Sequence, residues 1–450
     1  MTAHAKLSPS GSHQWFTCPG SIVLQAPLPN KHSEHSDSGT ACHEVAAWCL
    51  TEHYRASKRI GERIAVHYGD EEPRYVEFTE EMADLVQGYV DTVRKIGIGC
   101  RMLVEQRVEF SEYLDPAVLE LLGPQFGTLD CGIIDDRQHE LGIYDLKSGY
   151  TPVLVDDNSQ LKTYALGLMR KLLDEDLATD HTDPIRYVAE HLGIRTIRLG
   201  IFQPRVYSQG LVETVITIDD MIEFAETLRQ KASSVRGAHE SHGKMPQAEW
   251  ERIYLHPDPN EKDCAFCRAM ATCPAARRKV ESAIGDFPIV NETDMHVIDS
   301  STDADLLNDL MTTAPFAEDF FKAVRAEVER RLLMGLEVPD YGLELGRQGP
   351  RKWKDLDQAE EMVRKVFRIK IEDAYNMKLK SPTQIEDMTK AAEGEKPIIG
   401  PTQWKRLQDQ IVRSDPRPSV KAKAVIKKPY TAPAPDAADF GTVQDEDQLW

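Results

Sequence analysis

The chain has 450 residues, of which 41% are hydrophobic and 28% charged, a balance typical of a soluble protein with roughly two or three globular domains. Its net charge of −20 argues against a protein that coats nucleic acid through overall positive charge, although carboxylates that hold metals would add to the same negative count. No run of 18 apolar residues occurs, and residues 1–12 are polar, without the basic start and apolar stretch of a secretory signal. We therefore expect no membrane span and a cytoplasmic location, where the eight cysteines stay reduced and any cluster of them is a candidate metal site.

The first half of the chain predicts an α/β core. Apolar residues recur at helical spacing from about Gly39 to Leu50 and from Glu81 to Ile96. The period then changes to two, which is typical of strands in a small mixed or antiparallel sheet. The predicted strands are residues 101–110, 127–135, 140–147 and 195–203, and further helices are predicted at 158–173 and 218–235.

The second half predicts helices and a tail. A strongly helical segment covers residues 303–333, and we expect it to be broken near Pro315. Five prolines after Asp415 make a persistent helix improbable. We therefore divide the chain into a core domain with its cysteine segment (1–285), a linker (286–300), a helical accessory domain (301–414) and a flexible, basic then acidic tail (415–450).

One local motif suggests hydrolytic chemistry. Asp145-Leu-Lys147 ends a predicted strand, and Asp130 lies on the preceding strand. Two carboxylates side by side on a hairpin suit Mg²⁺ or Mn²⁺. Lys147 shares a strand face with Asp145, because side chains alternate along a strand, and its ammonium can position a metal-bound water beside a phosphodiester. An isolated Asp-x-Lys is also typical of a solvated strand end.

The cysteines give a second motif. Cys264, Cys267 and Cys273 have the spacing Cys-x2-Cys-x5-Cys, and Cys18, followed by Pro19, is the natural fourth ligand. Four thiolates can hold zinc or an iron–sulfur cluster, and the spacing does not separate the two. Three unligated buried cysteines are the alternative. The remaining cysteines lack such spacing and are expected to be small core residues: Cys42, Cys49, Cys100 and Cys131.

Together these motifs resemble the iron–sulfur branch of the PD-(D/E)XK nucleases, the RecB and AddB type. Within that branch the layout is similar to a bacteriophage and prophage family (DUF2800-like). Members have one N-terminal cysteine in a Ser-x-Ser…aromatic-x-x-Cys-Pro context, matched here by Ser8, Ser10, Trp15 and Cys18. The resemblance covers roughly residues 7–280. It implies a restriction-endonuclease-like core, a mixed sheet flanked by helices, with a [4Fe–4S] cluster that ties the N-terminal segment to the far side of the core.

The same resemblance assigns roles to individual residues. It implies a metal site whose ligands are His43, Asp130, Asp145 and the backbone carbonyl of Leu146. Lys147 would orient or activate the attacking water, and Glu105 would support the site. Gln160 and Tyr164, one helical turn apart, would face the DNA.

The function implied is that of a divalent-metal-dependent DNA nuclease. We expect an exonuclease that acts at DNA ends in phage replication or recombination, inside the bacterial host, and leaves 5′-phosphates. The alternative is a DNA-end-binding or recombination scaffold that keeps the fold and cluster but does not cut.

The expected partners are DNA and separate phage proteins. No Gly-x4-Gly-Lys-Ser/Thr motif is present, so a helicase would be a separate protein. A phage single-strand-binding or annealing protein is the other expected partner. The acidic segment before Trp450 resembles the tips with which single-strand-binding proteins recruit partners or compete with DNA. The eight basic residues of Lys405–Lys428 would contact phosphates or form a charged linker.

Overall fold

In the computed structural model the chain divides into two compact units, Met1–Glu344 and Leu345–Trp450. The described residues are 5–29, 33–68, 72–173, 184–285, 304–342, 386, 389–390 and 399–408. In the second unit they include the short helix α15 (Pro401–Gln408). The candidate metal site and the cysteine pocket both lie in the first unit.

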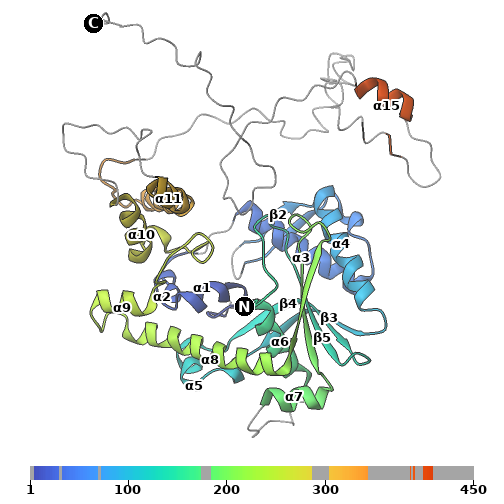
Figure 1. Ribbon diagram of the computed structural model, residues 1–450, viewed down its shortest axis with the longest axis horizontal. Coiled ribbons are helices and arrows are strands. Elements are labelled where there is room, and N and C mark those ends of the chain that lie inside the picture. The colour runs from blue at the N-terminus through green and yellow to red at the C-terminus, as the bar shows by residue number, and fades with distance from the viewer. Residues whose placement is uncertain are drawn as a thin grey trace, which may run out of the picture. The chain divides into compact units, whose positions relative to one another are not determined.

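A mixed sheet forms the centre of the first unit (Figure 1). Five strands are arranged in the order β3-β4-β5-β6-β7: β3 (Arg101–Glu109), β4 (Phe126–Asp135), β5 (Glu140–Leu146), β6 (Thr196–Phe202) and β7 (Leu211–Thr217). β5 and β6 run parallel, and the other neighbouring pairs are antiparallel. The α/β class and the mixed sheet are thus confirmed, and β7 is an edge strand that the sequence analysis did not predict.

Helices cover both faces of this sheet (Figure 1). One face carries α5 (Pro116–Leu122), α6 (Ser159–Leu172), α7 (Pro184–Leu192) and α8 (Ile218–Ser241) with the turn η3 (Ser111–Tyr113). The other carries α3 (Glu34–Glu52) and α4 (Glu80–Ile96), next to the turn η2 (Ala56–Arg59) and the hairpin β1 (Arg63–Val66) and β2 (Arg74–Glu77). α3 begins before the expected Gly39, because Ser33 and Ser36 form a capping box at its start.

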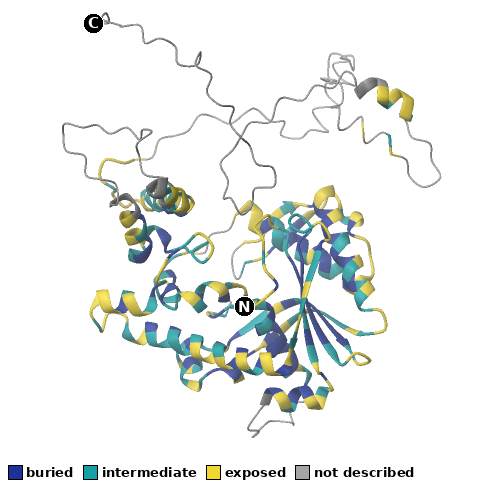
Figure 2. Ribbon diagram, viewed as in Figure 1, coloured by how far each residue is buried: buried dark blue, intermediate teal, exposed yellow. Residues whose placement is uncertain are grey.

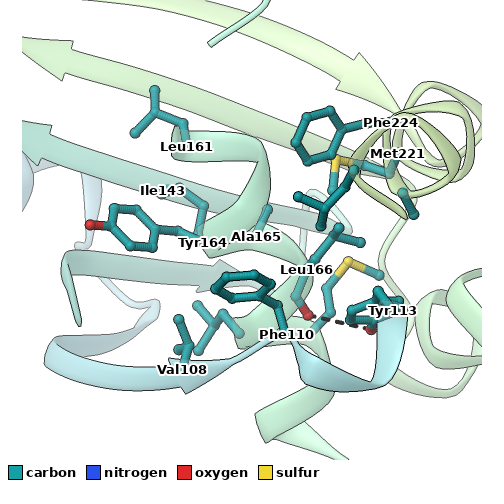
Figure 3. Close-up of a cluster of buried hydrophobic side chains, with 14 of the residues drawn as sticks. Val108, Phe110, Tyr113, Ile143, Leu161, Tyr164, Ala165, Leu166, Met221 and Phe224 are labelled. Atoms are coloured by element: carbon teal, nitrogen blue, oxygen red, sulfur yellow. Dashed lines mark hydrogen bonds between the residues drawn. The ribbon is translucent and has the colours of Figure 1, made fainter. Parts of the chain in front are cut away.

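Two hydrophobic clusters fix these layers. Figure 2 shows the buried residues concentrated along the strands and on the inward sides of the helices. Figure 3 shows the larger cluster, to which α6 contributes Leu161 and Ala165 and α8 contributes Phe224. The start of α6 is fixed by Asn158, whose side chain accepts a hydrogen bond from Leu161 N at 3.0 Å.

The N-terminal segment packs against α6 and α8. It consists of η1 (Pro9–Gly11), α1 (Ser12–Thr17) and α2 (Gly20–Gln25). Leu7 is fully buried, and its backbone N–H donates to Gln125 Oε1 at 2.8 Å. A segment far from the sheet in sequence is therefore part of the same core.

The cysteine segment follows α8. It contains α9 (Gln247–Tyr254), η5 (Met270–Thr272) and α10 (Pro274–Gly285), and α11 (Ala304–Leu333) packs against η5 and α10. The expected break of this last helix near Pro315 was wrong: α11 runs through the proline. The buried rings of Phe316 and Phe320, which pack on Met270, anchor the helix directly after that position and offset the hydrogen bond that the proline removes.

α11 thus lies within the first unit, whereas we expected residues 301–414 to form a domain of their own. The expected linker (286–300) and tail (415–450) lie outside the described residues. Among the helices described, none combines the length and apolar character that a membrane crossing needs.

Candidate functional site

A carboxylate on β3 and one on β4 face each other, at the point where the alternation of side chains between the two faces of the sheet is interrupted. Continuing the register of the strands places Glu105 opposite Asp130. On one side of this point Cys131 packs with α3 and α4, and on the other side Leu129 packs with α6 and α8. Glu105 adopts a left-handed backbone with φ of 48°, which is uncommon for such a residue and often marks a functional site.

A histidine from α3 completes this group. His43 Nδ1 lies 3.1 Å from Asp130 Oδ1, and Asp130 Oδ2 accepts a hydrogen bond of 2.7 Å from Leu146 N. Ligand atoms of His43, Glu105 and Asp130 all lie within 4.8 Å of one another. Histidine nitrogen and carboxylate oxygens at this spacing can hold one divalent cation.

A second network lies at the end of β5. Lys147 Nζ is 2.8 Å from Asp145 Oδ2 and donates to Gln160 Oε1 at 3.2 Å. Gln160 Nε2 in turn donates to Asp145 Oδ1 at 3.0 Å and to the Tyr164 hydroxyl at 3.3 Å. The start of α6 therefore holds the Asp-x-Lys pair in place.

The ionisation of these groups reflects their crowding. Burial acts to lower the pKa of His43, but Asp130 outweighs it and raises that pKa to about 9. Burial acts to raise the pKa of Asp130, but His43 outweighs it and lowers that pKa. Asp145 has a raised pKa because burial outweighs the adjacent Lys147. Burial acts to lower the pKa of Lys147, but the carboxylate of Asp145 outweighs it and raises that pKa. The site is therefore rich in negative charge that a cation would stabilise.

The structure brings the expected residues together, with one difference. The compact group contains Glu105, which we expected only to support the site, whereas Asp145 is engaged by Lys147 and Gln160. The backbone of Leu146 contributes its N–H to Asp130. Asp145 Oδ2 lies 2.8 Å from Lys147 Nζ and, as a carboxylate oxygen, has a second lone pair for a further contact.

The N-terminal segment supports α6 in a way that the sequence did not predict. Ser12 Oγ of α1 lies 2.6 Å from Ser159 Oγ, next to Gln160. Gly127 is required nearby, because a Cβ there would lie 2.7 Å from Pro9 and 2.8 Å from the Tyr164 ring. No spacing pattern marks Ser12 or Ser159, since their contact joins residues 147 positions apart.

The four cysteines of the second motif line one pocket. Cys18 comes from the start of the chain, and Cys264, Cys267 and Cys273 come from the segment before α10. Burial, reinforced by the three other thiols, raises the pKa of Cys18 to about 12. The other four cysteines lie outside this pocket: Cys42, Cys49, Cys100 and Cys131.

The comparison with protein families gives a match over nearly the whole chain. A family model described as "Protein of unknown function (DUF2800)" matches residues 4–424. The chain belongs to this family. The match includes both the carboxylate site and the cysteine pocket, so both are parts of one DUF2800 protein.

Glu105 makes stability depend on pH in the metal-free protein. Burial, followed by the charge of Asp130, raises its pKa from 4.5 to about 7. As pH rises through this interval the unfolded state releases the proton first, so folding stability is lost between about pH 4.5 and 7 and then levels off. Glu105→Gln should remove this loss of folding stability. We expect a modest change in stability, because part of the Glu105 side chain reaches solvent.

Thermal melts of Glu105→Gln and the native protein from pH 5 to 8 check this. The gain in melting temperature should grow up to about pH 7 and stay constant above it. An equal gain at every pH would contradict the assignment, and Glu109→Gln, at an exposed position further along β3, serves as the control.

Proposed function

We propose that this DUF2800 protein is a divalent-metal-dependent DNA nuclease of the PD-(D/E)XK type, with a restriction-endonuclease-like core of the RecB and AddB branch. One observation carries the proposal: a His–carboxylate group lies beside a buried Asp145–Lys147 pair at a strand end. A solvated strand end would not bury Asp145 to 3% exposure or join it to a lysine and a glutamine.

The residues fit a divalent cation. His43, Glu105 and Asp130 offer closely spaced ligand atoms, and Asp145 Oδ2 can add a ligand atom besides its contact with Lys147. Bound there, Mg²⁺ or Mn²⁺ would polarise the phosphodiester and lower the pKa of a water.

The protein side chains then have distinct tasks. Lys147 orients the attacking water and offsets charge on the phosphate, because its ammonium is held beside Asp145. Gln160 fixes the lysine, and Tyr164 fixes Gln160. In-line attack of the water on phosphorus breaks the P–O3′ bond, and a proton passes to the departing 3′-oxygen, so the products are a 5′-phosphate and a 3′-hydroxyl.

We also propose that the cysteine pocket holds a [4Fe–4S] cluster. Four thiolates can hold one zinc ion or a cluster with one iron for each thiolate. The proposal of a cluster follows the resemblance of the pattern Cys18, Cys264, Cys267 and Cys273 to the iron–sulfur nucleases.

The test is digestion of linear and circular DNA, each single- and double-stranded, with Mg²⁺ or Mn²⁺ and without metal. We expect metal-dependent cleavage that requires a free end and leaves 5′-phosphates. Cleavage of circles would replace the exonuclease assignment by an endonuclease. If the protein with its cluster intact cuts none of these substrates, the non-cutting scaffold becomes the better hypothesis.

A further inference from the structure

A surface beyond the candidate metal site combines aromatic rings with basic side chains. It lies at the C-terminal end of α3, on η2 and on the β1–β2 hairpin, and α3 contacts η2 and both strands of the hairpin; α3 and β2 are labelled in Figure 1. We call it the aromatic–basic patch and define it by six residues: Trp48, Tyr54, Arg55, Lys58, Arg63 and Tyr75.

The aromatic rings of this patch reach solvent. Tyr54 and Tyr75 are 42% and 54% exposed. Tyr54 stacks on Trp48 with ring centroids 5.0 Å apart and an interplanar angle of 27°. Lys58 Nζ lies 3.8 Å from the centre of the Tyr54 ring, and the Arg63 guanidinium lies 5.1 Å from that of Tyr75. Each exposed ring is thus paired with a mobile cation.

The patch is basic in an acidic protein. The chain has 74 acidic and 54 basic residues, yet residues 54–63 contain four basic residues and one acidic residue, Glu62. Glu62 pairs with Arg59 at 2.7 Å. Arg55, Lys58 and Arg63 form no ion pair with a carboxylate of the described residues. Three cations are therefore available to an anionic ligand.

α4 holds this surface in a fixed shape. Gln87 Oε1 accepts a hydrogen bond from Ala56 N at 2.9 Å, and Ala56 is fully buried. Arg94 donates to the backbone carbonyls of Cys49 and Tyr54 at 2.6 and 3.3 Å. A preorganised surface loses less conformational entropy when a ligand binds.

We propose that the aromatic–basic patch binds single-stranded DNA, with bases stacking on Tyr54 and Tyr75 and phosphates contacting the three free cations. Exposed rings interleaved with basic residues are what unpaired nucleotides require, whereas duplex bases are already stacked. On binding, a base takes the place of Lys58 over the ring, and the released ammonium turns to a phosphate.

The position on α3 connects this patch to the candidate metal site. Trp48 lies five residues after His43 on the same helix, a rise of about 7.5 Å. Trp48 points about 140° round the helix axis from His43, so a strand bound to the patch is held on the same helix as this metal ligand but on another side of it. This inference rests on the proposed function, because it supplies a single strand to that site.

Binding of a fluorescein-labelled thymidine oligonucleotide, followed by anisotropy without divalent metal, tests the stacking. Tyr54→Ala should weaken binding by about tenfold, whereas Tyr54→Phe, which keeps the ring, should bind like the native protein. An abasic oligonucleotide should bind the native protein more weakly, and Tyr54→Ala should then cause little further weakening, because the two changes remove the same interaction. Tyr341→Ala, at a ring 71% exposed elsewhere in this unit, is the aromatic control.

The salt dependence tests the role of charge. Combined Arg55→Ala, Lys58→Ala and Arg63→Ala should reduce the slope of log K against log salt by about 2, because each neutralised phosphate of a single strand contributes about 0.7 to that slope. Arg229→Ala on α8, where Arg229 pairs with Glu226, should leave the slope unchanged. Thermal melts of every variant establish that it is folded.

Two results separate this inference from the nuclease proposal. If the folded patch variants bind single strands like the native protein, or if duplex DNA binds more tightly than single strands, the inference is overturned even where the protein cuts DNA. If binding depends on the patch but no substrate is cut, the inference stands and the nuclease proposal fails.

Discussion

Lys147→Ala is expected to reduce the rate of DNA cleavage by about 10²-fold or more. The ammonium of Lys147 lies 2.8 Å from Asp145 Oδ2, and in the proposed reaction it is the cation that the protein itself places beside the attacking water. Its removal also leaves Asp145 buried without its neutralising partner, which raises the pKa of that carboxyl further. The measurement is the single-turnover rate at saturating Mg²⁺ or Mn²⁺ on the best substrate of the digestion assay.

The matched control is Lys171→Ala. Lys171 is an exposed lysine on α6 that contacts Gln106 and the carbonyl of Arg107. This variant should cut at nearly the native rate, because its ammonium lies outside the carboxylate network. If Lys147→Ala remains folded and binds single-stranded DNA normally yet cuts within threefold of the native rate, the proposed chemistry at this site is wrong.

Cys264→Ser is expected to abolish the broad visible absorbance of the protein and to lower its melting temperature by about 10 °C or more. A bound cluster contributes its binding energy to folding, and that contribution disappears with a ligand. The pocket joins Cys18 with residues about 250 positions further along, and a link that closes so long a loop restricts the unfolded chain strongly. Absorbance spectra, iron analysis and thermal melts of anaerobically purified protein measure both effects.

Cys100→Ser is the control, because Cys100 lies outside the cysteine pocket and contacts Arg137 at the surface. The Cys100→Ser variant should keep the visible absorbance and the melting temperature of the native protein. A colourless native protein that contains zinc would replace the proposed cluster by zinc. Native protein with neither metal, and a melting temperature unchanged by Cys264→Ser, would remove the metal assignment altogether.

The Cys264→Ser substitution in the cysteine pocket should also affect the candidate active site. Cys18 directly follows α1, and Ser12 on α1 contacts Ser159 beside Gln160. On heating, the Cys264→Ser variant should therefore lose cleavage activity at a lower temperature than that at which its β-sheet unfolds. At low temperature its cleavage rate should be closer to native than that of Lys147→Ala, since Lys147 and Asp145 are unchanged.

Local sequence was sufficient for most elements of the core. The period-2 runs placed β3, β4 and β5 within one or two residues, and the helical period placed α4 within one. β7 was missed because Leu211–Thr217 mixes apolar and polar residues in a short edge strand whose partner, β6, is set by tertiary pairing. The continuous helix through Pro315 was missed because packing of Phe316 outweighs the local preference of proline.

The residues of the candidate site could be named from the sequence, but their geometry could be predicted only in part. Asp145 and Lys147 are two residues apart on one strand, so their proximity follows from strand geometry alone. Glu105 joins His43 and Asp130 only because its backbone turns to a φ of 48° where the strands change faces. An alternating pattern cannot reveal such a change, because it assumes that each strand keeps one face throughout.

The sequence by itself determined the types of the core elements, the candidate metal ligands and the spacing of the three C-terminal cysteines, because each depends on neighbours along the chain. Only the tertiary structure decided that Cys18 shares a pocket with those cysteines, that Ser12 supports the start of α6, and that Lys58 lies over the Tyr54 ring and Arg63 over the Tyr75 ring. Several of these contacts join segments far apart in the sequence, and burial of the hydrophobic clusters on the two faces of the sheet and around the cysteines brings those segments together.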